Sequence, residues 1–299
     1  MRSGFVDNAP ATKTDFTDEQ LAQGQREVEE TDLKTGYDEA AIESYSVFRQ
    51  LKADGIIEQD VKFQVSLPTI ANVVGLLIEE DFRPLVEFIY EKALFKALQT
   101  IQDVIPHEDL AIQIDLGMDM AYWEGTVFKP WFSDRRYVID YIGRMISCVH
   151  RDVDLGLHYC YGDMEHKHFV EPTSLRSITD LHRQIAELNL RSIQWIHCPV
   201  PLSAMGNLED FFAPLSTLGR HLDQTKLYLG LVHPHDLEGT KTRIAAAEKV
   251  LAEFGVATEC GWGRITRPGD LQSIMDICRE VSGCSVTKGN EVRETRSEG

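Results

Sequence analysis

The sequence has no long apolar run and comparatively few basic residues, and each absence excludes a class of function. No stretch of apolar residues approaches the roughly 20 that a helix needs to cross a bilayer. Lys and Arg number 30 against 48 Asp and Glu, which gives a formal net charge of −18. A chain this acidic lacks the stripe of basic residues that binds phosphates. We therefore expect no nucleic-acid partner and no docking on an anionic membrane.

Cysteine is also scarce, and the first residues lack the features of a secretory leader. The 6 cysteines are spread thinly through 299 residues, which favours a reducing compartment over a disulfide scaffold. The opening "MRSGFVDNAPATKTDF" has no apolar core of the kind that a signal peptide needs. We therefore expect a cytoplasmic protein.

What is present is a regular alternation of strand-like and helical patterns. The strand-like runs lie at 61–66, 110–115, 154–160, 192–198, 226–232 and 255–260. The clearest helical patterns between and after them lie at 83–104, 135–150, 174–190, 240–254 and 269–282. This alternation is typical of an α/β protein with a parallel sheet and right-handed crossovers, so a doubly wound sheet and a barrel both agree with it.

The strand ends favour the barrel. Polar or special residues follow nearly every strand, in "SLPT", "DLGMD", "HYCYGD", "HCPVP", "VHPHD" and "ECGWGR". Chemistry at the C-terminal end of every strand is the pattern of a TIM (β/α)8-type barrel. Only about six strands are recognisable, so we expect a barrel that is incomplete at its N-terminus.

The predicted domain organisation has three parts. Residues 1–36 are acidic and polar and predict a flexible arm, with at most a weak helix at 18–30. Residues 37–284 predict a single barrel domain, because no linker divides them. Residues 285–299 predict a disordered tail.

Four side chains at three strand ends have the donor types of a zinc site. His158 and Cys160 are two residues apart in a strand and therefore point to the same side. With His197 and Cys260 they would supply two thiolates and two imidazoles, a complete tetrahedral shell for Zn2+. The spacing is long-range, so the alternative is that each residue is simply packed or hydrogen-bonded.

The motifs "HYCY", "IQWIHC" and "ATECGWGR" resemble the C-terminal barrel of cobalamin-independent methionine synthase, in the superfamily that includes uroporphyrinogen decarboxylase. With "FQVSLPT" and "HYCYGD" the resemblance is closest to a poorly characterised stand-alone branch, and it covers roughly residues 60 to 282. It implies that His158, Cys160 and Cys260 hold a zinc ion that activates a thiol for methyl transfer. His197 stands where the synthase has a Glu.

Two departures from the family pattern bear on function. "QIDLGMD" has Leu116 where the synthase has the Glu of a Glu-Pro pair used around its amino-acid substrate, and the first two barrel strands have no counterpart. We therefore expect a zinc-dependent transferase or lyase that activates a thiol or polarises a small substrate, and that is not methionine synthase itself. The alternatives are a metal-free decarboxylase or lyase, and a degenerate homologue with a binding role. A homo-oligomer would cover the open barrel edge.

Further candidates lie beside these motifs. The predicted catalytic residues are Asp115, His166 and His233. The predicted substrate-binding residues are Asp119, His168, Trp262 and Arg264. Histidine suits acid–base work near neutral pH, and Arg264 would pair with a carboxylate. The alternatives are a solvated loop for His166 and His168, a surface turn for His233 and a helix N-cap for Asp119.

Overall fold

A computed structural model of the chain describes residues 16–125, 128–162, 167–222, 224–262 and 267–282. Six parallel strands form one sheet, and each strand pairs with the next one along the chain. They are β1 (Phe63–Pro68), β2 (Leu110–Leu116), β3 (Asp154–Tyr159), β4 (Trp195–Pro199), β5 (Lys226–Val232) and β6 (Gly255–Thr258).

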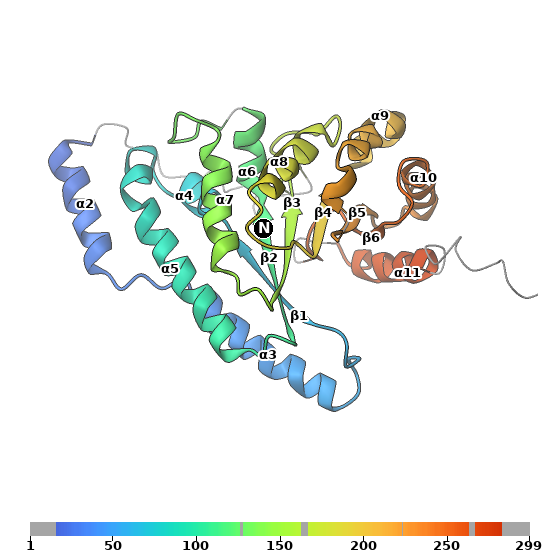
Figure 1. Cartoon of the computed structure of the whole chain (residues 1–299), viewed down its shortest axis with the longest axis horizontal. Coiled ribbons are helices and arrows are strands. Elements are labelled where there is room, and N and C mark those ends of the chain that lie inside the picture. Colours follow the sequence, from blue (N-terminus) through green and yellow to red (C-terminus); the bar gives the residue numbers. More distant parts are fainter. Residues whose placement is uncertain (1–15, 126–127, 163–166, 223, 263–266, 283–299) are drawn as a thin grey trace, which may run out of the picture.

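Helices precede, connect and follow the strands and form the outer layer of the molecule (Figure 1). They are α2 (Asp18–Glu30), α3 (Tyr37–Ala53), α4 (Ile70–Leu77), α5 (Arg83–Val104), α6 (Gly117–Glu124), α7 (Tyr137–Cys148), α8 (Arg176–Glu187), α9 (Leu208–Phe212), α10 (Leu237–Ala247) and α11 (Asp270–Ser282). Short 3-10 turns lie at Glu80–Phe82, Leu202–Gly206, Ala213–Thr217 and Gly219–Leu222. Neighbouring helices α3, α5, α7 and α8 contact one another in that order, as in the outer ring of a barrel.

The sheet has one apolar face and one polar face. In β2, Ile112 and Ile114 are fully buried, whereas Gln113 and Asp115 between them remain partly accessible. In β1, Gln64 and Ser66 on the same polar face are exposed. Because side chains alternate along a strand, the apolar set meets the helices and the polar set lines what would be the interior of a closed barrel.

The barrel is open in the described part of the chain. None of the described strands pairs with the outer edge of β1 or of β6. Over the described residues the fold is therefore an α/β barrel with six strands, where a closed barrel of this type has about eight. This confirms the predicted fold class, including the deficit of strands.

Part of the acidic N-terminal segment is helical. Residues 18–30 form the regular helix α2, and Thr17 and Gln20 cap its first turn with reciprocal side-chain to backbone bonds. The ring of Phe16 meets that of Phe82 edge to face, with 4.9 Å between centroids, which attaches this helix to the barrel. Residues 1–15 and the predicted tail lie outside the described residues.

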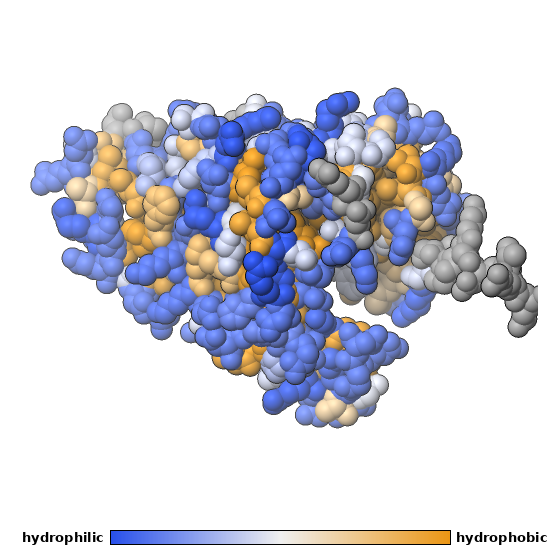
Figure 2. Space-filling model, in the orientation of Figure 1, coloured by the Kyte–Doolittle hydropathy of each residue, from blue (hydrophilic) through white to orange (hydrophobic). Residues whose placement is uncertain are grey.

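Most of the surface in view is hydrophilic, as the charge of −18 leads one to expect (Figure 2). Within the described ranges, no helix is both long and apolar enough to cross a membrane.

Candidate metal centre

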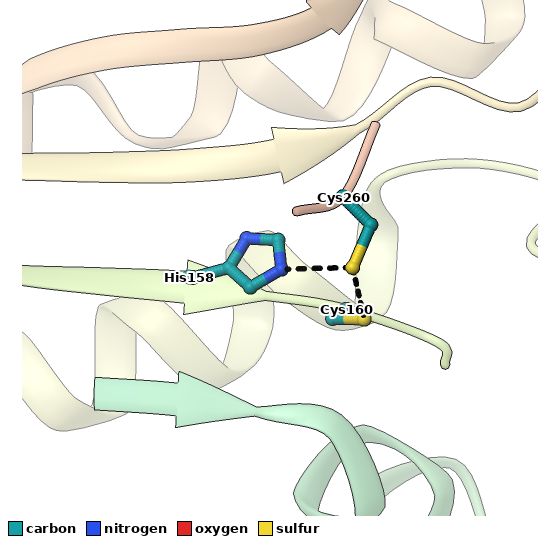
Figure 3. A group of neighbouring side chains, drawn as sticks. All are labelled: His158, Cys160 and Cys260. Atoms are coloured by element: carbon teal, nitrogen blue, oxygen red, sulfur yellow. Dashed lines mark hydrogen bonds between the residues drawn. The ribbon is translucent and has the colours of Figure 1, made fainter. Parts of the chain in front are cut away.

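Three of the predicted ligands meet where the strands end. His158 lies on β3, Cys160 directly follows that strand, and Cys260 lies just beyond β6 (Figure 3). The Cys260 Sγ atom is 3.8 Å from His158 Nε2 and 3.8 Å from Cys160 Sγ. One ligand atom from each residue lies within 4.8 Å of the other two. The fold thus brings together residues about one hundred positions apart in the chain.

The donor set and the distances suit a tetrahedral metal ion. Two sulfurs bound to zinc at about 2.3 Å each are separated by about 3.8 Å when the angle between them is tetrahedral. The observed sulfur–sulfur distance has this value and is far beyond the roughly 2.05 Å of a disulfide. The His158 ring is 5% exposed, and within the described residues its Nδ1 has no hydrogen-bond partner. A metal at Nε2 would compensate part of the cost of burying this ring.

The surroundings favour a thiolate at Cys260. The hydrogen bond from Cys160 and the adjacent His158 ring hold the pKa of the Cys260 thiol well below its ordinary value, although burial opposes them. The backbone N–H of Gly162 also donates to Cys160 Sγ, at 3.2 Å. Thiolates are the form in which cysteine binds metal, so the group is suited to a soft divalent ion.

The loop after Cys160 turns at Gly162, whose φ is +77°. A side chain there would be strained, and its Cβ would also lie 2.6 Å from the Phe169 ring. Glycine thus lets the chain turn sharply behind the ligand while Phe169 packs against the turn.

His197, the fourth predicted ligand, stands beside the group rather than in it. Its ring stacks on His158 with 4.6 Å between centroids, and the two residues are paired neighbours on β4 and β3. Its Nε2 donates to the carbonyl of Thr258 at 2.9 Å, which leaves Nδ1 without a proton in the neutral ring. Burial and the charge of His158 lower the pKa of His197 to about 3. His197 is therefore a neutral imidazole next to the three candidate ligands.

Asp115, predicted to be catalytic, occupies the neighbouring position on the other side. It pairs with His158 in the register of β2 and β3, and its Oδ1 accepts a bond from Gln113 Nε2 at 2.9 Å. Burial lowers the pKa of His158, but Cys260 and the charge of Asp115 outweigh it and raise that pKa. Asp115, His158 and His197 thus form a row across the polar face of the sheet.

A second group of charges lies beside the ligands, and part of it was missed from the sequence. His168 is placed between two carboxylates, with Nδ1 2.7 Å from Glu171 and Nε2 3.1 Å from Glu259. Burial lowers the pKa of His168, but Glu259 and Glu171 outweigh it and raise it to about 9. The other oxygen of Glu259 is 3.9 Å from Nδ1 of His233, another predicted catalytic residue.

His233 is held as a neutral ring with a defined tautomer. Its Nε2 donates to the carbonyl of Val200 at 2.9 Å, so Nδ1 carries the lone pair that faces Glu259. Burial lowers the pKa of His233. Glu259 directly precedes the candidate ligand Cys260 in "ATECGWGR", and that adjacency is the signal by which the sequence could have identified it.

Asp119, predicted to bind substrate, lies inside the fold. It is 0% exposed, and its carboxylate accepts bonds from Thr69, Tyr141 and Asn72. In this position the carboxylate joins α6 to the N-terminal turn of α4 and to α7. Trp262 is 48% exposed and donates to Thr258 Oγ1 at 3.2 Å, close to Cys260 in the chain. His166 and Arg264 lie outside the described residues.

No protein-family model matches the sequence, and a search of curated proteins finds no match. Among solved structures, the chain is similar to a B12-independent methionine synthase from Shewanella sp. W3-18-1 in complex with selenomethionine, with a TM-score of 0.52 and 15% identity over 85% of this chain and 68% of that one. A Listeria monocytogenes protein, provisionally assigned as a vitamin-B12-independent methionine synthase, gives 0.46 and 16% over 78% and 67%. The likeness to the Shewanella structure shows that this chain has the barrel fold of that enzyme.

Proposed function

We propose that the chain is a zinc-dependent enzyme that activates a thiol, or polarises a small substrate, for alkyl transfer or a related lyase reaction. The observation that carries the proposal is the convergence of His158, Cys160 and Cys260 at the C-terminal ends of the strands. In this fold, reactions take place at that end of the barrel. A site with three protein ligands leaves a position for substrate, as catalytic zinc sites do.

Bound there, zinc would supply a Lewis acid that keeps a substrate thiol in its nucleophilic thiolate form. The chain's own residues handle the proton that such a thiol gives up. Nδ1 of His233 carries a lone pair, and Glu259 lies 3.9 Å away to stabilise the ring once it is protonated. His168 balances the charge of Glu259 from the other side, at 3.1 Å.

The proposal excludes methionine synthase itself. Leu116, which follows Asp115 at the end of β2, is fully buried and apolar, so it offers no carboxylate to an amino-acid substrate. The polar face of β1, with Gln64 and Ser66, is exposed rather than enclosed. We expect no methyl transfer from a methylated folate to homocysteine at an enzymatic rate, which a standard methionine-formation assay would check.

Metal content is the direct test. Wild-type protein purified without added metal should hold close to one equivalent of zinc, and Cys160→Ser and Cys260→Ser should lose most of it, because each removes one of two thiolates. Cys278→Ser is the matched control, since this half-buried cysteine lies on α11, outside the group. A wild type without zinc, or serine variants that keep it, would show that the cysteines are only packed together.

One observation favours a second candidate function, a binding protein in which the metal is structural. The open sheet leaves part of the would-be interior exposed at β1, so a small substrate would be less well shielded from water there. A thiol-alkylation assay separates the two candidates. Zinc-dependent turnover that His233→Gln removes while zinc content is kept supports the enzyme, and zinc binding without turnover supports the binding protein.

A further inference from the structure

A second cluster of metal-ligating side chains lies at the opposite end of the sheet. His107 is in the loop that leads from α5 into β2, and His150 and Asp152 are in the loop that leads from α7 into β3. β2 and β3 are parallel neighbours, so the loops that precede them lie side by side. One ligand atom from each of the three residues lies within 4.8 Å of the other two.

The three side chains face one another and are open to solvent. His107 Nδ1 is 2.8 Å from Asp152 Oδ2, and the rings of His107 and His150 meet edge to face with 5.1 Å between centroids. The side chain of His107 is 26% exposed and that of Asp152 is 73% exposed. An ion can therefore reach the cluster, and the exposed carboxylate is free to move by the fraction of an ångström that a metal between it and His107 requires.

The cluster is held in place by a buried residue that contacts both loops. The backbone carbonyl of Gln102, which is 2% exposed, accepts a bond from His107 Nε2 at 3.0 Å. Its side-chain Oε1 accepts the backbone N–H of His150 at 2.7 Å. Arg191 donates to the carbonyls of Val149, His150 and Val153 and so fixes the second loop.

The bond to the Gln102 carbonyl keeps one proton on Nε2 of His107, and a second proton lies between Nδ1 and Asp152, so a metal at Nδ1 displaces only that second proton. With Nε2 donating to a carbonyl, Nδ1 is the nitrogen left to face Asp152 and His150. Metal-binding histidines characteristically donate their other N–H to a carbonyl or carboxylate in this way. The arrangement of His107 is thus that of a ligand whose outer partner is already in place.

We propose that His107, His150 and Asp152 form a second metal site, for a divalent transition-metal cation such as Zn2+, Co2+ or Ni2+. Two imidazoles and one carboxylate suit these ions, whereas the thiolates of the first group favour softer metal ions. The ion takes the place of the proton that His107 Nδ1 shares with Asp152, and solvent fills its remaining positions. It links two loops at the N-terminal face, where this fold places stability rather than catalysis.

Cobalt titration of the full chain distinguishes the two sites. Thiolate-bound Co2+ gives a strong near-ultraviolet charge-transfer band, whereas Co2+ bound by imidazole and carboxylate does not. Equilibrium dialysis gives the total bound Co2+, and the intensity of the thiolate band gives the Co2+ bound by cysteine. We expect the total to exceed the cysteine-bound amount by one equivalent. That result holds whether or not the cysteine centre binds metal.

Three variants complete the test. His107→Gln should remove the extra equivalent, or weaken its Kd at least tenfold, without changing the thiolate band. Asp152→Asn, at a largely exposed position that does not endanger folding, should weaken it in the same direction. His235→Gln is the control, because His235 also pairs with a carboxylate, Asp270 at 3.0 Å, but belongs to neither metal group of the described residues. The inference fails if no extra equivalent binds, or if the three variants bind alike.

Discussion

At the scale of single residues, the buried carboxylate of Asp119 makes stability depend on pH. Burial raises its pKa to about 6, although the bonds from Tyr141, Thr69 and Asn72 oppose the shift. The ordinary value is 3.8, so between about pH 4 and pH 6 the folded protein keeps a proton that the unfolded chain releases. The stability that this group contributes is therefore greatest at low pH and falls as the pH rises through that window.

Asp119→Asn should remove this part of the pH dependence. A shift of roughly two pKa units corresponds to about 3 kcal/mol in the free energy of unfolding. Wild type should lose this stability between about pH 4 and pH 6, and the variant should not. Urea unfolding at several pH values in that range gives the measurement, and the difference between the two proteins cancels the other titrating groups. Parallel stability profiles would contradict it. The variant is expected to be less stable overall, because its amide N–H groups meet hydroxyl donors.

At this scale, the sequence indicated which side chains lie close together where a motif placed them at strand ends. His158 and Cys160 share one strand face, and "ATECGWGR" placed Cys260 at another strand end, so their meeting followed from the fold. The position of Asp119 did not follow, because its burial depends on Thr69 and Tyr141, which are distant in the chain. No local pattern distinguishes a carboxylate that faces a substrate from one that faces two hydroxyl groups inside the core.

At the scale of elements, periodicity was the reliable guide. The helical pattern at 83–104 coincides with α5 (Arg83–Val104), and the strand-like run at 226–232 coincides with β5 (Lys226–Val232). Long amphipathic or apolar segments carry this signal because one face is buried throughout. The helix at 18–30 was underestimated, because none of its residues is fully buried and its start is defined by a capping box.

Packing between β3 and β4 on the polar face depends on a glycine. A Cβ added at Gly156 would lie 1.8 Å from the Trp195 ring, which Gln113 Oε1 holds through a 3.3 Å hydrogen bond. Gly156→Ala should therefore displace the indole and destabilise the fold by about 1–3 kcal/mol. Gly206→Ala, where no atom lies within 4 Å of the added Cβ, should change stability by less than about 0.5 kcal/mol. Denaturant midpoints that move equally in the two variants would disprove this account.

At the scale of the whole molecule, the sequence was sufficient to count strands but not to show what shields them. Six strand patterns were readable and six strands are described, so the shortfall from a closed barrel was predictable. What covers the edges of β1 and β6 depends on surfaces outside this sheet. The periodicity of the strands carries no information about those surfaces. A second copy of the chain remains our proposal for that role, since unpaired strand edges are prone to associate.

The proposed metal centre would link the ends of two strands, so global stability should depend on whether it is filled. Cys160 and Cys260 lie 100 residues apart at the ends of β3 and β6, so an ion between them joins the middle of the sheet to its last strand. A ligand that binds only the folded state stabilises it by about 2.7 kcal/mol at a hundred times its Kd. At about 2–4 °C per kcal/mol for a domain of this size, a strong chelator should lower the Tm of wild type by roughly 5–10 °C.

The cysteine variants assign that shift to the centre. Cys260→Ser should melt lower than wild type and respond little to the chelator, because one of its two thiolates is already gone. Cys278→Ser, which leaves the three ligands intact, should keep the full response. Differential scanning calorimetry with and without chelator supplies the comparison. If the chelator lowers the Tm of wild type and of Cys260→Ser equally, the ion that it removes is bound elsewhere. The cluster at His107, His150 and Asp152 is then the next candidate, because it also links loops that precede neighbouring strands.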